Sequence, residues 1–126
     1  MKTDDRQLIL VIDDSPTEAQ LVTKILERAS FRVKWAKDAA SGVTMAQQLL
    51  PDLILMDVVM PGMNGFQATR RIARGNATKH IPIIMLTTKD QETDKIWGIR
   101  QGASDYLIKP ADSTELLSKI RMLIKH

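Results

Sequence analysis

Cysteine is absent from the 126-residue sequence, which excludes disulfide bonds and thiolate metal sites. Long apolar runs are also absent: none approaches the ~20 residues of a membrane-spanning helix, and residues 1–7 are polar and too short for a signal peptide. Glycine and proline are too few for a low-complexity chain. We therefore expect one folded domain over residues 1–126, cytoplasmic and without membrane insertion, with residues 1–7 as a polar N-terminal extension.

Neither positive nor negative side chains are in large excess. The formal net charge is +3, from 18 Lys and Arg against 15 Asp and Glu. That is mildly basic and far from the signature of a nucleic-acid-binding chain, so we expect no nucleic-acid partner and a surface of mixed charge.

Short apolar runs alternate with longer amphipathic stretches along the chain. Runs this short and continuous are typical of strands buried on both faces of a sheet. They are Leu8 to Ile12, Phe31 to Ala36, Leu53 to Met56, Ile83 to Leu86 and Asp105 to Ile108.

The intervals between the runs read as helices. Ser15, Asp38, Asp90 and Asp112 are candidate N-caps, and Glu18 stands where a capping box with Ser15 requires it. The side chains expected to face the core are Leu21, Val22, Ile25, Leu26 and Ala29, then Val43, Ala46, Leu49 and Leu50, then Phe66, Ile72 and Ala73, then Ile96 and Ile99, and finally Leu116, Ile120 and Leu123.

Five strands that alternate with five helices predict an α/β fold, a parallel sheet covered on both faces by right-handed crossovers. Such sheets bind ligands at the carboxyl ends of the strands, where the strand order reverses. The expected strand ends all carry polar side chains: Asp13 and Asp14 after the first, Asp57 after the third, Thr87 and Thr88 after the fourth, and Lys109 after the fifth.

Three carboxylates in one crevice repel one another unless a cation is present. Mg²⁺ suits such a site, because it takes few carboxylates and accepts phosphate oxygens. Lys109 supplies a positive charge suited to phosphate, and Thr87 a hydroxyl donor. A carboxylate can itself act as the nucleophile and form an aspartyl phosphate. The alternative interpretation is that these residues are only helix caps and surface residues.

The sequence resembles the receiver domains of two-component response regulators over residues 8–126. Within that family it is most similar to the single-domain, chemotaxis-like regulators of type IV pilus twitching motility. The matching motifs are Val11 to Ser15, Met56 to Gly65, Thr87, and Tyr106 to Pro110; the narrower likeness lies in Asp13 to Glu18, Asn64 to Arg70, and Thr87 to Gln101.

The resemblance implies a doubly wound, flavodoxin-like sheet in the order 2-1-3-4-5 and a cis bond before Pro110. It implies that Asp57 accepts a phosphoryl group from a histidine kinase. The implied Mg²⁺ ligands are Asp14, Asp57 and the backbone carbonyl of Val59, with Asp13 acting mainly through coordinated water. Thr87 and Lys109 would hold the phosphoryl oxygens, and Tyr106 would be the aromatic partner of Thr87 in the switch.

Three positions depart from patterns common in the family and are expected to tune the phosphorylated lifetime. Val59 is apolar where some relatives carry an amide or acid, Lys89 is basic where some carry an acid, and Thr88 stands where alanine is common. Tyr106 could also be a plain packing residue. Trp97 is either a partner contact or a residue packed in the core or half-buried, and Trp35 is expected to be structural.

Competing functions differ in their motifs. A phosphohydrolase using an aspartyl phosphate would place the nucleophile after the first strand in an Asp-x-Asp pattern, whereas Asp13 and Asp14 are adjacent here. A receiver fold used only for binding would usually lack one of the key site residues, and none of them is missing from this sequence. We therefore expect a signalling protein, with no enzymatic activity beyond its own phosphorylation and dephosphorylation. No output domain follows in the sequence, so output would run through protein contacts at the fourth helix, fifth strand and fifth helix, or through competition for phosphoryl groups.

Overall fold

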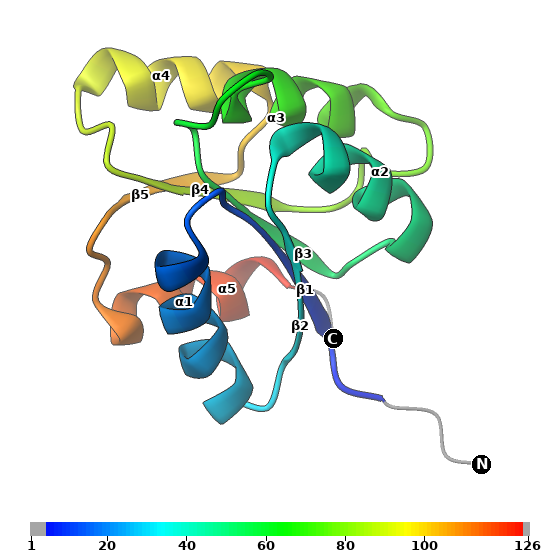
Figure 1. Ribbon diagram of the computed structural model, residues 1–126, viewed down its shortest axis with the longest axis vertical. Coiled ribbons are helices and arrows are strands. Elements are labelled where there is room, and N and C mark those ends of the chain that lie inside the picture. The colour runs from blue at the N-terminus through cyan, green and yellow to red at the C-terminus, as the bar shows by residue number, and fades with distance from the viewer. Residues whose placement is uncertain (1–4, 125–126) are drawn as a thin grey trace.

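The computed structural model describes residues 5–124 and shows five parallel strands that alternate with five helices (Figure 1). The strands are β1 (Leu8–Ile12), β2 (Arg32–Ala36), β3 (Leu53–Met56), β4 (Ile83–Thr87) and β5 (Asp105–Ile108). The helices are α1 (Pro16–Arg28), α2 (Ala39–Leu49), α3 (Gly65–Arg74), α4 (Glu92–Gln101) and α5 (Ser113–Leu123). The sheet order is β2-β1-β3-β4-β5, as expected.

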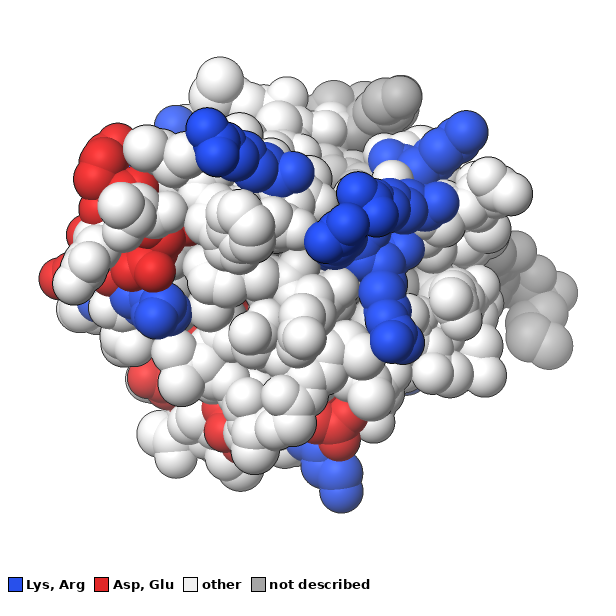
Figure 2. Space-filling model, turned by 90° about the horizontal axis from the view of Figure 1, so that it is seen from above, with Lys and Arg blue, Asp and Glu red and all other residues white. Residues whose placement is uncertain are grey.

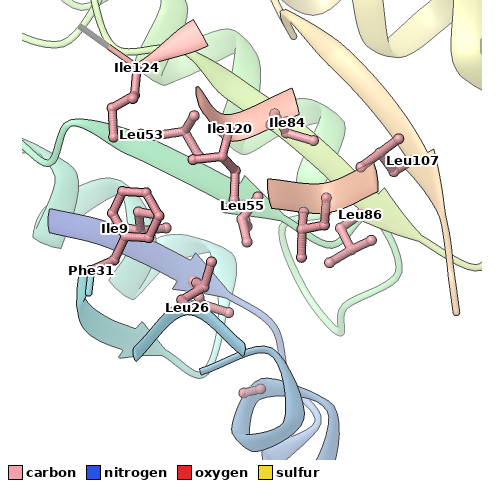
Figure 3. Close-up of a cluster of buried hydrophobic side chains, with 13 residues drawn as sticks. Ile9, Leu26, Phe31, Leu53, Leu55, Ile84, Leu86, Leu107, Ile120 and Ile124 are labelled. Carbon is pink, nitrogen blue, oxygen red and sulfur yellow. The ribbon is translucent and has the colours of Figure 1, made fainter. Parts of the chain in front are cut away.

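The helices cover the sheet in two layers. In Figure 1, α1 and α5 lie on one face, and α2, α3 and α4 lie on the other. Alternate residues of each strand contribute side chains to the cores on the two faces of the sheet, because successive side chains of a strand point to opposite faces. In β1, Ile9 and Val11 join the core under α1 and α5, while Leu10 and Ile12 join the core under α2 and α3. Figure 3 shows the first of these cores, in which Leu26 of α1 and Ile120 of α5 close over the sheet.

Three of the four expected N-caps are present. The side chains of Ser15, Asp38 and Asp112 each accept a hydrogen bond from a backbone N–H in the first turn of their helix. The fourth expectation was wrong by one residue, since Gln91 rather than Asp90 precedes α4, and its N–H donates to Asp94. The Lys109–Pro110 peptide bond is cis, as the family resemblance implied.

Five apolar side chains expected in the core are exposed instead: Leu21, Leu49, Leu50, Ile96 and Ile99. In α4 the residue that faces the sheet is Gly98, where a Cβ would lie 2.7 Å from the Met85 sulfur. At about 100° of rotation per residue, Ile96 and Ile99 then point away from the sheet.

The other three exposed residues lie on α1 and at the C-terminal end of α2. In α1, Ala19 and Leu26 are the buried positions, and Leu21 lies about 200° around the helix from Ala19. In α2, Leu49 is the last helical residue, and Leu50 has a left-handed backbone with φ 46°, so the chain turns away before either side chain meets the core.

Candidate functional site

The carboxyl ends of β1 and β3 bring two aspartates together at the point where the strand order reverses. The Asp13 N–H donates to the Ala36 carbonyl at 3.1 Å, and the Asp57 N–H donates to the Ile12 carbonyl at 2.9 Å. Both residues therefore continue the sheet's hydrogen bonding by one step, which fixes their backbones. Their side chains are largely removed from solvent, with 4% and 8% of the residue exposed.

Asp14 completes a cluster of three carboxylates. One oxygen from each of Asp13, Asp14 and Asp57 lies within 4.8 Å of the others, and among residues 5–124 this is the group of acidic or histidine side chains that could share a cation. Unlike the other two, Asp14 is exposed. A site made only of carboxylate oxygens suits a hard divalent cation, since Mg²⁺ and Ca²⁺ prefer oxygen ligands.

Both carboxylate oxygens of Asp13 already have partners in the protein. Oδ1 accepts the Ser15 N–H at 2.9 Å, and Oδ2 accepts a hydrogen bond from Lys109 Nζ at 2.7 Å. The backbone carbonyl of Asp13 accepts the indole N–H of Trp35 at 2.8 Å. These contacts fix the orientation of Asp13 and leave Asp14 as the more available ligand.

Lys109 places its ammonium group among three acids. Besides Asp13, Nζ donates to Glu18 Oε2 and lies 3.5 Å from Asp57 Oδ2. Burial alone would lower the pKa of Lys109, but the hydrogen bonds to Asp13 and Glu18 and the charge of Asp57 outweigh burial and raise it. The lysine therefore stays charged beside Asp57 across the physiological pH range.

Burial raises the pKa of Asp57 above its usual value, and the neighbouring charge of Asp13 adds to this effect. Lys109, a hydrogen bond with Thr87 and the Val59 N–H, 3.4 Å from Asp57 Oδ1, all act in the opposite direction. The carboxylate is thus partly desolvated and surrounded by donors, an arrangement that suits a nucleophile whose product carries more negative charge.

Thr87 and Tyr106 connect the site to α4. Thr87 is fully buried, and its hydroxyl oxygen accepts the Lys89 N–H at 3.4 Å. The hydroxyl of Tyr106 donates to the Lys89 carbonyl at 2.8 Å, and burial, followed by the charges of Asp94, Asp57 and Asp90, raises the tyrosine pKa to about 12. Because the ring is buried and its hydroxyl has a partner, Tyr106 ties β5 to the loop that joins β4 to α4.

The three positions expected to tune the lifetime have different surroundings. Val59 is 55% exposed, two residues after Asp57. Thr88 is exposed and lines a groove of about 500 Å³ that also contains Lys109. Lys89 Nζ lies 3.6 Å from Asp94 Oδ1, so its charge points toward α4 instead of standing unpaired over Asp57.

Gly65 permits the close approach of α3 to the site. A Cβ at this position would lie 2.0 Å from the Asp57 carbonyl oxygen, and the Gly65 N–H donates to the Val58 carbonyl at 3.0 Å. A glycine at position 65 is therefore required by the close approach of the two backbone segments.

Sequence reasoning missed two contributors to the site. Glu18 was expected to complete a capping box, but its carboxylate contacts Lys109. Trp35 was expected only to be structural, whereas its indole contacts Asp13. A glutamate at N3 of a helix matches the capping pattern whether or not its side chain turns back, so the motif contained no signal for this contact.

The face formed by α2, α3 and α4 carries a charged and apolar surface beside the site. Figure 2 shows Lys and Arg side chains gathered on this face. The α3 arginines Arg70, Arg71 and Arg74 line one hollow there. On α4, Trp97 is 50% exposed between the exposed Ile96 and Ile99, which excludes a fully buried core position and agrees with half-buried packing or a partner contact.

Comparison with known proteins assigns the family. The model of the response regulator receiver domain matches residues 9–121. The chain belongs to the response-regulator receiver family. It is 53% identical over 116 residues to Protein PilH of Pseudomonas aeruginosa, which covers 92% of this chain and 96% of PilH. It is 44% identical to the DNA-binding regulator RpaA of Synechocystis, and there the match spans 48% of the longer protein.

Solved receiver structures share the fold. The Vibrio cholerae chemotaxis protein CheY4 superimposes with a TM-score of 0.88 at 32% identity, covering 94% of this chain and 99% of CheY4. A receiver domain of a sensor histidine kinase from Pseudomonas aeruginosa, solved with a magnesium ion in its active-site cleft, gives a TM-score of 0.87 at 30% identity and covers 94% and 97% of the two chains. None of the helices within residues 5–124 of the present receiver is both long and apolar enough to cross a membrane.

Proposed function

We propose that this receiver is a phosphoaccepting response regulator, in which Asp57 takes a phosphoryl group from a phosphohistidine of a histidine kinase. The observation that carries the proposal is the position of Asp57, which is buried within a cluster of three carboxylates and has Lys109 Nζ 3.5 Å away. A carboxylate that only capped a helix would need neither the acidic neighbours nor the lysine.

The donor set fits Mg²⁺. Asp14, Asp57 and the Val59 carbonyl would be the direct ligands, and Asp13 would act through coordinated water because both of its oxygens already have partners. When bound, the cation neutralises charge on the phosphoryl oxygens. The magnesium-bearing receiver structure with the same fold supports this cofactor.

The residues of the site have separate tasks in the transfer. A carboxylate oxygen of Asp57 forms a bond to phosphorus while the bond from phosphorus to the kinase imidazole breaks, and the electron pair of that bond stays on the ring nitrogen. Lys109 and Thr87 donate to the phosphoryl oxygens. Water later attacks the phosphorus, which releases inorganic phosphate and restores the Asp57 carboxylate. We expect no enzymatic activity beyond this self-phosphorylation and self-dephosphorylation.

Output would run through the surface of α4, β5 and α5. Tyr106 contacts the loop before α4, so a movement of Thr87 toward the phosphoryl group would reach the exposed Trp97. A phosphoryl group can only shift the balance between two conformations by its different interaction with each. If the protein instead acts as a sink that competes for phosphoryl groups, it would require no such surface.

The likeness to PilH over 96% of its length supports a chemotaxis-like system that controls twitching motility, and we expect the protein to act in the cytoplasm. The partners would then be a histidine kinase and an output protein, with no nucleic acid.

Incubation with acetyl phosphate and Mg²⁺, followed by mass spectrometry, tests the proposal. We expect one phosphoryl group on the unaltered protein and none on Asp57→Asn. The matched control is Asp90→Asn, which removes the same charge from an exposed loop residue. Equal labelling of the Asp57 variant would show that another residue is the acceptor.

A further inference from the structure

The first turn of α1 contains only half of the capping box that its sequence predicts. Ser15 Oγ accepts the Glu18 N–H at 3.3 Å, which is the first half of the motif. The second half would be a hydrogen bond from the Ser15 N–H to the Glu18 carboxylate. Instead, the Ser15 N–H donates to Asp13 Oδ1, which frees the Glu18 carboxylate for another partner.

The box is complete elsewhere in the chain, so its absence at α1 is specific. At the start of α3, the Asn64 side chain accepts the Gln67 N–H at 2.9 Å, and Gln67 Oε1 accepts the Asn64 N–H at 3.0 Å. At α1, the corresponding side chain of Glu18 reaches across to Lys109, 91 residues away in the sequence.

A lysine ammonium group has three N–H donors, and Lys109 has three acidic neighbours. It donates to Asp13 and Glu18, and Asp57 is the most distant of the three at 3.5 Å. A new phosphoryl group on Asp57 would bring oxygens that need a short, charge-assisted bond from the same ammonium group. Since Nζ now lies close to Asp13 and Glu18 and 3.5 Å from Asp57 Oδ2, a short bond to the new oxygens draws it toward Asp57 and lengthens its bond to one of the two near partners.

Glu18 is the partner that can be released at the lowest cost. Its side chain is 42% exposed, so water can solvate the released carboxylate. The side chain of Asp13 is only 6% exposed, and a buried carboxylate that loses its partner is strongly destabilised.

We propose that Glu18 is a positioning residue that competes with the phosphoryl group for Lys109. By holding the ammonium group toward α1, it favours the unphosphorylated protein and lowers the affinity of the site for a phosphoryl group. This inference rests on the proposed function, because it assumes that Lys109 serves a phosphoryl group on Asp57.

Beryllofluoride, an anion that imitates a phosphoryl group on a carboxylate, provides the test. Its dissociation constant is measured at saturating Mg²⁺ by tryptophan fluorescence. Loss of a partly exposed ion pair corresponds to a factor of about two to five, so Glu18→Gln should bind beryllofluoride about two- to fivefold more tightly. A variant that was merely damaged would bind more weakly, so a gain in affinity cannot come from a structural defect.

Two further variants separate contact from charge. Glu18→Asp keeps the charge but is one methylene shorter, so it should show at least half of the gain. Glu27→Gln removes the same charge from an exposed position of α1 and should leave the affinity unchanged. Unchanged or weaker binding by Glu18→Gln, unaltered affinity of Glu18→Asp, or an equal gain in Glu27→Gln would overturn the inference. If the unaltered protein does not bind beryllofluoride with Mg²⁺, the proposed function itself fails.

Discussion

Gly65→Ala should damage both the fold and the site, because position 65 has no room for a side chain. The new Cβ would lie 2.0 Å from the Asp57 carbonyl oxygen and 2.8 Å from its carbonyl carbon, whereas real Cβ contacts essentially never fall below 3.0 Å. The Cβ and the oxygen must therefore separate by at least 1.0 Å. Both atoms belong to backbone segments with little freedom: the Asp57 N–H is bonded to Ile12, and the Gly65 N–H to Val58.

Overpacking of this kind costs about 1–3 kcal/mol and sometimes more. Since the obstacle is backbone and cannot rotate away, we expect a loss near 3 kcal/mol in the free energy of unfolding. That is a large part of the roughly 5–15 kcal/mol that stabilises a domain. Displacement of the Asp57 backbone should also weaken Mg²⁺ binding.

Urea denaturation with and without Mg²⁺ measures both effects. Gly62→Ala is the matched control, since position 62 has φ +78° and nothing within 4 Å of a new Cβ. It should cost about 1–2 kcal/mol through its left-handed backbone and leave Mg²⁺ affinity unchanged. A loss below about 1 kcal/mol for Gly65→Ala, with normal Mg²⁺ affinity, would refute the reasoning.

Two further predictions concern the metal and the lifetime. Asp14→Asn should weaken Mg²⁺ binding more than Asp13→Asn, because Asp14 is the exposed carboxylate and both oxygens of Asp13 have partners. A Mg²⁺ titration followed by Trp35 fluorescence measures this through the contact of Trp35 with Asp13, and the reverse order would contradict the division of roles. Val59→Asn adds a polar group two residues from Asp57, so the decay rate of the phosphorylated protein should change several-fold while its Mg²⁺ affinity stays the same. An unchanged decay rate would show that position 59 does not orient the attacking water.

Much of the fold was predictable because the strand signals are strong. The central strands β1 and β3 are apolar throughout, β4 is apolar up to its last residue, Thr87, and all three are buried on both faces, so their runs were visible without periodicity. The polar residues at their ends then indicated where the site lies. The caps at Ser15, Asp38 and Asp112 followed from local chemistry, which acts within one helical turn.

The errors arose where tertiary packing decides between similar local patterns. Apolar residues at positions 96 and 99 indicated an inward face for α4, but the helix meets Met85 and Tyr106 through Gly98, and no property of a glycine in isolation marks it as the contact. The contact of Glu18 with Lys109 depends on where β5 ends relative to α1, a long-range relation that a capping motif does not encode.

The strand order also determines which backbone could pair with another molecule. With β2 and β5 at its two ends, the sheet has open edges, and open edges invite intermolecular strand addition and aggregation. The β2 edge carries the exposed Lys34, and β5 is only four residues long and carries Asp105, whose carboxylate lies 3.1 Å from Lys119. Charge on one edge and brevity on the other disfavour such pairing, so contacts with partners fall to the helical faces instead of the sheet edges.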